Sequence, residues 1–275
     1  MLLVTDKKST NLKMKKLTRT VYVLVACFCL TNYAVAQTVD LESGLVAYYP
    51  FNGNANDESG NGNDGLLSNV EFQSGLSSTN NDKAAFFNRN KKSHVKVDNK
   101  FDNLRNASFS FWFKKSSGVK EVLIQTASLK VSFYESESRI RIYLHEDRNG
   151  NASRELTTKV DFPVDYIKDK WNYLVVSVNN ENECFLTING KKLNNTGVYR
   201  EQDGGIYNET IIGGSKSTLS SSMGTQMYHG ALDNLRIYNR ALSEEEVAAL
   251  YELEKPKAQP GDLLWSFETG GRVRS

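Results

Sequence analysis

The sequence predicts an all-β protein: an antiparallel sandwich of two sheets with one short C-terminal helix. Among 275 residues there are only four prolines but 13 Tyr, 13 Phe and 19 Gly, which favours many strands joined by Gly- and Asn-containing turns. Segments with strand-like alternation also follow one another at hairpin spacing. A hydrophobic content of 39% argues against disorder, and a net charge of +2 gives no strong field for nucleic acid or an anionic membrane.

The first 36 residues are predicted to be a signal peptide rather than part of the fold. A basic cluster at 15–19 precedes an apolar run at 21–30, and the small residues at 34–36 resemble a cleavage site. The run is too short to span a bilayer comfortably, and Met14 is a possible true start. The alternatives are a buried N-terminal helix, or a bacterial lipobox in which Cys27 is lipidated. We therefore expect a secreted, periplasmic or cell-surface protein.

Removal of the signal peptide would leave Cys184 as the one cysteine of the mature chain. A single thiol cannot form an internal disulfide, so the core must hold the fold, with a metal as a further aid. Cys184 lies in an alternating apolar segment, which indicates a buried structural thiol rather than a nucleophile.

The strand predictions rest on apolar residues at every second position. Phe109, Phe111 and Phe113 would share one side of a strand. Residues 139–144 predict a strand with one apolar, buried face and one polar, solvent-facing face. Asn189-Gly190 is a tight-turn signal. The predicted strands cover residues 45–51, 108–113, 140–144, 171–178, 184–188, 211–212 and 232–238.

One helix is predicted after the last strand. Ser243 is a favourable N-cap, and Glu246 three residues later completes a capping box. Val247, Leu250 and Tyr251 fall on one face at helical spacing, so we expect this helix to seal an edge of the sandwich.

Four segments resemble bacterial laminin-G-like jelly-roll domains of the concanavalin A-like lectin/glucanase superfamily. They occur in the family's order between about residues 40 and 252, and the first and last read GLVAYYPFNGNANDESGNGNDG (44–65) and GALDNLRIYNRALS (230–243). The resemblance implies a curved jelly roll over residues 37–254. It also implies a non-catalytic binding or adhesion module, with a glycan or an extracellular protein as partner.

The loop at 52–65 is the predicted metal site. Its Asn, Asp and Gly residues provide hard oxygen ligands on a bendable backbone, which suits Ca²⁺ and not zinc. The family resemblance also implies a structural Ca²⁺ near this loop, with a distant ligand in the last strand. The alternative is a metal-free turn, since the same residues favour turns. The predicted ligands are Asp57 and Asp233, followed by Asn52, Asn61 and Asp64.

Enzymatic activity is not predicted. The β-glucan-cleaving enzymes of the superfamily carry Glu-x-Asp-x-x-Glu on one strand, and that string is absent here. Glu135 and Glu137 come closest but lack the middle Asp and the third carboxylate. The three histidines stand singly, without metal-ligand spacing.

A sugar-binding site would need exposed aromatic side chains beside polar groups. The weak candidates, each with the alternative of a partly buried packing residue, are Tyr166, Tyr199, Tyr207 and Tyr228.

The C-terminal residues suggest a larger protein. A Pro/Lys linker is predicted at 255–262. Residues 263–275 resemble the first strand of a quinoprotein-like β-propeller blade, so we expect that a propeller follows in the intact gene; a frayed tail or an extra edge strand are the alternatives. Three functions remain: a secreted binding module with structural Ca²⁺, an accessory domain of a larger propeller-containing or carbohydrate-active protein, and a degenerate glycosidase.

Overall fold

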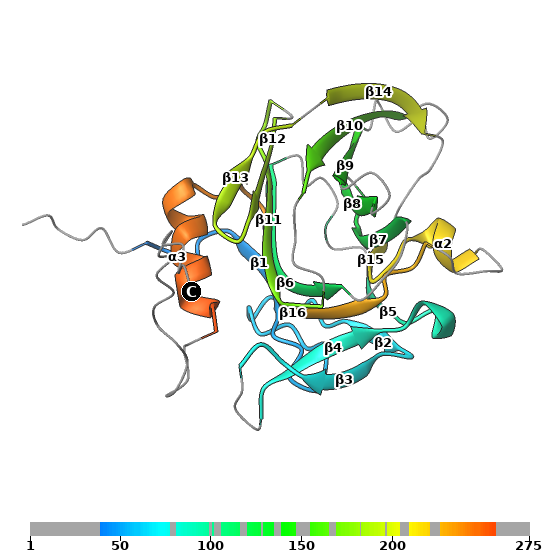
Figure 1. Ribbon diagram of the computed structural model, residues 1–275, viewed down its shortest axis with the longest axis vertical. Coiled ribbons are helices and arrows are strands. Elements are labelled where there is room, and N and C mark those ends of the chain that lie inside the picture. Colours follow the sequence, from blue (N-terminus) through cyan, green and yellow to red (C-terminus); the bar gives the residue numbers. More distant parts are fainter. Residues whose placement is uncertain are drawn as a thin grey trace, which may run out of the picture. The chain divides into compact units, whose positions relative to one another are not determined.

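The described chain forms two antiparallel β-sheets that face each other, and one α-helix lies on the side of the first sheet that faces away from the second (Figure 1). The predicted signal peptide and residues 263–275 lie outside the described residues. For residues 145–146, 155–159 and 198–203 only the backbone is described. The computed structural model describes residues 39–77, 81–98, 101, 106–115, 120–127, 129–134, 139–146, 155–164, 169–181, 183–195, 197–203, 209–220 and 226–256.

Sheet A has eight strands in the order β13-β12-β11-β6-β16-β4-β3, with β1 paired to the second half of β16. Its strands are β1 (Leu45–Tyr49), β3 (Glu71–Ser74), β4 (Lys83–Phe87), β6 (Ala107–Lys115), β11 (Asn172–Val178), β12 (Cys184–Ile188), β13 (Lys191–Leu193) and β16 (Gly230–Tyr238).

Sheet B also has eight strands, in the order β14-β10-β9-β8-β7-β15-β5-β2. Its strands are β2 (Leu66–Ser68), β5 (His94–Asp98), β7 (Lys120–Gln125), β8 (Leu129–Tyr134), β9 (Arg139–Glu146), β10 (Glu155–Pro163), β14 (Gly197–Asp203) and β15 (Glu209–Ile212). The described helices are a 3₁₀ turn, η1 (Arg89–Lys91), the short α2 (Lys216–Ser220) and α3 (Glu244–Glu254).

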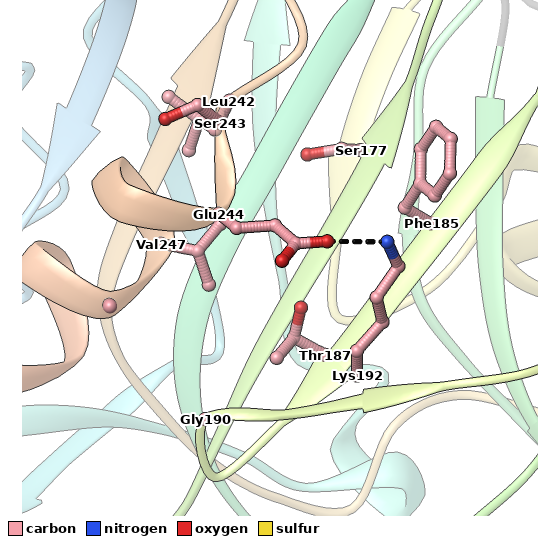
Figure 2. Close-up of a pocket in the computed structure, with 10 residues that line it drawn as sticks. Ser177, Phe185, Thr187, Gly190, Lys192, Leu242, Ser243, Glu244 and Val247 are labelled. Carbon is pink, nitrogen blue, oxygen red and sulfur yellow. Dashed lines mark hydrogen bonds and ion pairs between the residues drawn. The ribbon is translucent and has the colours of Figure 1, made fainter.

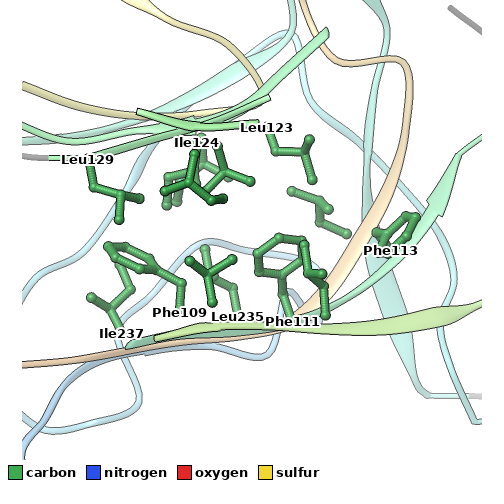
Figure 3. Packing of buried hydrophobic residues seen from close by; sticks show 14 of the residues in the cluster. Phe109, Phe111, Phe113, Leu123, Ile124, Leu129, Leu235 and Ile237 are labelled. Atoms are coloured by element: carbon green, nitrogen blue, oxygen red, sulfur yellow. The ribbon is translucent and has the colours of Figure 1, made fainter. Parts of the chain in front are cut away.

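The main core lies between the sheets and is filled by alternate apolar side chains of strands such as β6, β8 and β9. Phe109, Phe111 and Phe113 of β6 are buried on the same face, as predicted. With side chains of β16 they point toward those of β7 and β8 across the core (Figure 3). Alternation fixes which residues face inward, because a shift of one residue would turn the whole set outward. These features confirm the predicted antiparallel jelly-roll sandwich.

The first strand is shorter than predicted, since β1 ends at Tyr49. Pro50 has no N–H with which to extend the ladder, and Phe51 takes a left-handed backbone conformation with φ of 54°. Phe51 nevertheless remains in the core, where its ring stacks on that of Tyr49.

Helix α3 begins as predicted, with both hydrogen bonds of the Ser243–Glu246 capping box present. Its position differs from the prediction, because it covers the outer face of sheet A rather than an edge. The large outward-facing rings of Trp112 and Tyr173 are buried by the helix, where Tyr251 stacks on Trp112 and contacts Tyr173 at a tilt. Neither α3 nor any other helix in the described part of the chain has the length and apolar character needed to cross a membrane.

Cys184 lies at the start of β12 and is buried. Burial raises the pKa of its thiol to about 12, so the sulfur remains protonated at neutral pH. The structural thiol that the sequence indicated is therefore confirmed.

Candidate functional site

Asp57 organises the 52–65 loop through hydrogen bonds to the backbone. Its Oδ1 accepts from the N–H groups of Tyr48 and Ser59, each at 2.9 Å, and its Oδ2 accepts from the N–H of Asn63 at 2.9 Å. Burial raises the pKa of Asp57, but the hydrogen bonds from Ser59, Tyr48 and Asn63 outweigh it and bring the pKa below its ordinary value. Both carboxylate oxygens of Asp57 therefore stabilise the backbone of the loop.

The other residues predicted as ligands in the loop also form hydrogen bonds with backbone groups, within the loop or on neighbouring strands. Asp64 Oδ1 accepts from the N–H of Asp57 at 2.8 Å, and Asn52 Oδ1 accepts from the N–H of Lys83 at 3.0 Å. Asn61 Nδ2 donates to the carbonyl oxygen of Leu45 at 2.9 Å. Within the described residues, no group of three or more Asp, Glu, His or Cys side chains has a metal-binding arrangement. The geometry of the loop thus fits the turn interpretation.

Asp233 of β16 lies in a different environment from the loop. Its side chain is fully buried, with 0% of its surface exposed, and its Oδ2 accepts from the N–H of Leu76 at 2.9 Å. Its Oδ1 has no hydrogen-bond partner among the described residues. Burial, with a smaller contribution from the nearby charge of Asp82, raises the pKa of Asp233 to about 7, although the hydrogen bond from the N–H of Leu76 lowers it.

Asp82 and Asp233 approach the same point of the backbone. A Cβ atom placed on Gly75 would lie 2.6 Å from Asp82 Oδ2 and 2.9 Å from Asp233 Oδ2. The N–H of Ser77 also donates to Asp82 Oδ2. Two neighbouring carboxylates are hard oxygen donors of the kind that Ca²⁺ takes. Of the five residues predicted as ligands, Asp233 is thus a buried carboxylate with an oxygen that has no hydrogen-bond partner among the described residues, and Asp82, which no sequence signal marked, lies close to it.

The described tyrosine candidate is a packing residue. Tyr228 is fully buried, its ring centroid lies 6.0 Å from that of Phe87, and its hydroxyl donates to the carbonyl oxygen of Ala231 at 3.1 Å. The packing alternative therefore holds for Tyr228, because a buried ring offers no face to a sugar. Tyr166, Tyr207 and the side chain of Tyr199, in β14, lie outside the described residues.

Polar side chains gather on the face of sheet B that points away from sheet A. Because the alternate residues of β8 and β9 fill the core, their neighbours face outward. We call the following set the outer patch, and the pairing of β7 to β10 brings its members together: Lys120, Lys130, Ser132, Tyr134, Arg139, Arg141, Tyr143 and Asp161.

Two tyrosines occupy the centre of the outer patch. The hydroxyl groups of Tyr134 and Tyr143 are hydrogen-bonded to each other. Lys130 Nζ lies 4.0 Å from the centroid of the Tyr143 ring, while the Tyr134 ring has Arg141 Cζ at 4.6 Å and Lys120 Nζ at 5.0 Å. These are cation–π distances, so the rings hold the cationic side chains in place.

Asp161 anchors the two arginines of the outer patch. Arg139 Nη1 and Arg141 Nη2 donate to Asp161 Oδ2 at 2.7 and 2.8 Å, and Arg141 Nε donates to Asp161 Oδ1. Burial raises the pKa of Asp161, but the hydrogen bonds and charges of Arg141 and Arg139 outweigh it and hold the pKa below its ordinary value. This carboxylate is therefore ionised at neutral pH.

The outer patch also contains the buried hydroxyl group of Ser132. It lies opposite Arg141 on the neighbouring strand, and 1% of its surface is exposed. Its Oγ has no hydrogen-bond partner among the described residues. An unsatisfied buried hydroxyl costs about 1–3 kcal/mol, so such groups commonly bind water or ligand atoms.

A groove lies between α3 and strands β12 and β13. This groove has a volume of about 340 Å³, which suits a small ligand. Glu244 and Lys192 reach toward each other across it and form an ion pair (Figure 2). Lys192 Nζ also lies 5.0 Å from the ring centroid of Phe185, which is 38% exposed. The groove residues are Ser177, Phe185, Thr187, Gly190, Lys192, Leu242, Ser243, Glu244, Val247 and Ala248.

The polar groups of the groove are largely engaged with one another. Ser177 Oγ is hydrogen-bonded to Ser108 Oγ at 2.7 Å, and Lys192 is paired with Glu244. A ligand here would meet mainly apolar side chains and few groups that could orient it. The outer patch is therefore the stronger candidate for a specific binding site.

Residues 89–248 match a family described as the concanavalin A-like lectin/glucanases superfamily. Among curated proteins, none matches the sequence.

Several solved structures share the fold. The binding domain of Paraclostridial Mosquitocidal Protein 1 is 19% identical, with a TM-score of 0.55 over 77% of this chain and 52% of that one. The binding domain of botulinum neurotoxin DC in complex with SialylT is 13% identical, with a TM-score of 0.53 over 78% and 53%. This chain thus spans about half the length of those two. Domain 4 of AbnA, a GH43 extracellular arabinanase from Geobacillus stearothermophilus, in complex with arabinotriose, is 19% identical, with a TM-score of 0.51 over 76% and 98%.

Proposed function

Because the chain belongs to the concanavalin A-like lectin/glucanase superfamily, we propose that it is a non-catalytic module that binds a glycan on the outer face of sheet B. The observation that carries the proposal is the outer patch, where two tyrosines, two arginines and an unpartnered buried hydroxyl meet on neighbouring strands. Sugar sites place a few polar groups in fixed positions. In this patch the rings of Tyr134 and Tyr143, 9% and 5% exposed, support the cationic side chains above them and offer no open stacking face. The complexes of AbnA domain 4 with arabinotriose and of the neurotoxin domain with SialylT support a glycan as the ligand class.

The carboxylate chemistry of the outer patch supports binding rather than hydrolysis. Glycosidases commonly need two carboxyl groups, of which one must be protonated to act as an acid. The carboxyl group described in the patch, that of Asp161, is held ionised between Arg139 and Arg141. Glu135 and Glu137 lie outside the described residues. Release of reducing ends from any bound polysaccharide would contradict the non-catalytic proposal.

We also propose a structural Ca²⁺ held by Asp233 and Asp82. A bound cation would neutralise two carboxylates that otherwise repel each other, and it would tie β16 to the segment before β4. The unpartnered Oδ1 of Asp233 supports this proposal. The predicted signal peptide further supports a location outside the cytoplasm, at the cell surface or in the medium.

A glycan array probed with the purified protein tests the binding proposal. Lys130→Ala and Lys192→Ala form a matched pair, because each lysine lies over an aromatic ring, the first in the outer patch and the second in the groove. We expect Lys130→Ala to weaken the array signal and Lys192→Ala to leave it unchanged. The proposed site would be refuted if no glycan on the array bound the protein, or if Lys192→Ala weakened binding and Lys130→Ala did not.

A further inference from the structure

We propose that the groove between α3 and strands β12 and β13 binds a free α-amino acid with an aromatic side chain, at a site separate from the outer patch. The groove has a volume of about 340 Å³, and small-molecule sites commonly measure about 300–1,000 Å³. Its residues come from the outer face of sheet A and from the first residues of α3. The groove therefore offers room for a single small molecule.

Apolar side chains of the groove would hold the body of the ligand. Phe185 of β12 is 38% exposed, so part of its ring face is open to water. Leu242, Val247 and Ala248 line the side of the groove that α3 forms. A ligand ring that enters between them removes apolar surface from water on both sides, and paired rings attract each other beyond the area that they bury. The groove therefore favours an aromatic side chain.

Lys192 and Glu244 provide one positive and one negative group on opposite sides of the groove. Lys192 Nζ, from β13, lies 2.5 Å from Glu244 Oε1, at the start of α3 (Figure 2). The two side chains are 51% and 78% exposed, so the pair contributes little to stability and opens easily. A ligand with both an ammonium and a carboxylate group can enter between them, with the ammonium donating to Glu244 and the carboxylate accepting from Lys192. Each charge then exchanges one partner for another, and none is left unpaired.

The position of Lys192 connects the charged part of the site to the apolar part. Its Nζ lies 5.0 Å from the centroid of the Phe185 ring, which is a cation–π distance. A carboxylate bound to Lys192 is therefore held beside that ring. In an α-amino acid the ammonium, the carboxylate and the side chain all join one carbon atom. This chemistry matches the close placement of Glu244, Lys192 and Phe185 around the groove.

A sugar fits the groove less well than an amino acid does. Sugars present many hydroxyl groups, but two hydroxyl groups of the groove are already engaged. Ser177 Oγ is hydrogen-bonded to Ser108 Oγ, and Ser243 Oγ accepts from the N–H of Glu246. An uncharged apolar ligand would bury its surface here but would gain nothing from the two charged groups.

The test is an NMR titration of the purified protein with L-phenylalanine and with two analogues that each lack one charge. Phenethylamine lacks the carboxylate, and 3-phenylpropionate lacks the ammonium. Lys192→Gln and Glu244→Gln each remove one charge from the groove, and Ala248→Phe fills it from an exposed position. The matched controls are Lys91→Gln and Glu71→Gln, which open another exposed ion pair outside the groove. Circular dichroism checks that each variant is folded.

We expect L-phenylalanine to bind with a Kd on the order of 1 mM or below, and each analogue to bind roughly threefold more weakly. In Lys192→Gln, phenylalanine should bind no more tightly than phenethylamine. In Glu244→Gln, it should bind no more tightly than 3-phenylpropionate. Ala248→Phe should abolish binding, whereas the two controls should leave it unchanged.

Three results would overturn the inference. Equal affinities for the three ligands would show that the groove is apolar without recognising charge. Equal affinities for phenylalanine and N-acetylphenylalanine would show that the ammonium is not recognised and that the groove takes the carboxyl end of a peptide instead. Absence of binding by all of these compounds would show that the groove is not an amino-acid site. In each case the proposed glycan site stands, because the glycan array tests it separately.

Discussion

Replacement of Asp233 by Asn tests the proposed cation site, because the two side chains share a shape and differ in charge. The pKa of Asp233 is raised from 3.8 to about 7. A shift of about three units corresponds to about 4 kcal/mol. In the metal-free protein this group favours folding while it is protonated, so its contribution is complete below pH 3.8 and is lost as the pH rises to about 7. In EDTA above pH 7, Asp233→Asn should therefore be more stable than the wild type, by up to about 4 kcal/mol.

Ca²⁺ should narrow that difference, because it stabilises the wild type and not the variant. A cation at about 100 times its Kd stabilises the folded state by about 2.7 kcal/mol. For a chain of this size this corresponds to a rise in Tm of about 5–10 °C. Thermal unfolding with Ca²⁺ and with EDTA, at pH 5 and pH 8, measures both effects. The reasoning would be refuted by a wild-type Tm that responds to neither additive, or by a full Ca²⁺ response in Asp233→Asn.

Asp57→Asn is the matched control for the other predicted ligand. Its carboxylate accepts three backbone N–H groups, so the amide should lower the free energy of unfolding by about 1–3 kcal/mol. The loss should be the same in Ca²⁺ and in EDTA. A Ca²⁺ response that disappears in Asp57→Asn and persists in Asp233→Asn would return the metal to the 52–65 loop.

Three further substitutions test the fold and the outer patch. Ser243→Ala removes the cap of α3 and should cost about 1 kcal/mol in denaturant unfolding; no change would show that the capping box is not needed. Phe109→Ala should cost about 3–5 kcal/mol, because it opens a cavity between the sheets, and a loss below 1 kcal/mol would contradict the assigned core. The lowered pKa of Asp161 stabilises the fold above the pKa of about 3.9 for an unfolded Asp, and this is lost as the pH falls through the lower folded pKa. Asp161→Asn should therefore be less stable than the wild type at pH 7, and the difference measured by urea unfolding should shrink as the pH falls below about 3.9.

The fold was predictable from the sequence because its signals are local. Alternation at Phe109, Phe111 and Phe113 marks a core strand, and Ser243 with Glu246 marks a helix start. The place of α3 was not predictable in the same way. It depends on Trp112 and Tyr173, whose rings lie side by side only once β6 and β11 have paired.

The sites were less predictable, because each depends on contacts between distant segments. Asp233 was identified from the family resemblance, but its neighbour Asp82 lies in no motif and meets it through the fold around Gly75. Alternation in the sequence showed that one face of the strand at 139–144 is polar. It did not show that this face forms part of a patch, because Tyr134 and Asp161 join it only through the strand order β8-β9-β10.

The central claim is that the outer face of sheet B receives the glycan. The most direct measurement is an NMR titration of the isotope-labelled protein with the glycan that the array selects. The account predicts that backbone amide signals of β8, β9 and β10 shift, while those of β12, β13 and the start of α3 stay in place. Shifts confined to the groove residues around Phe185 and Glu244 would contradict it.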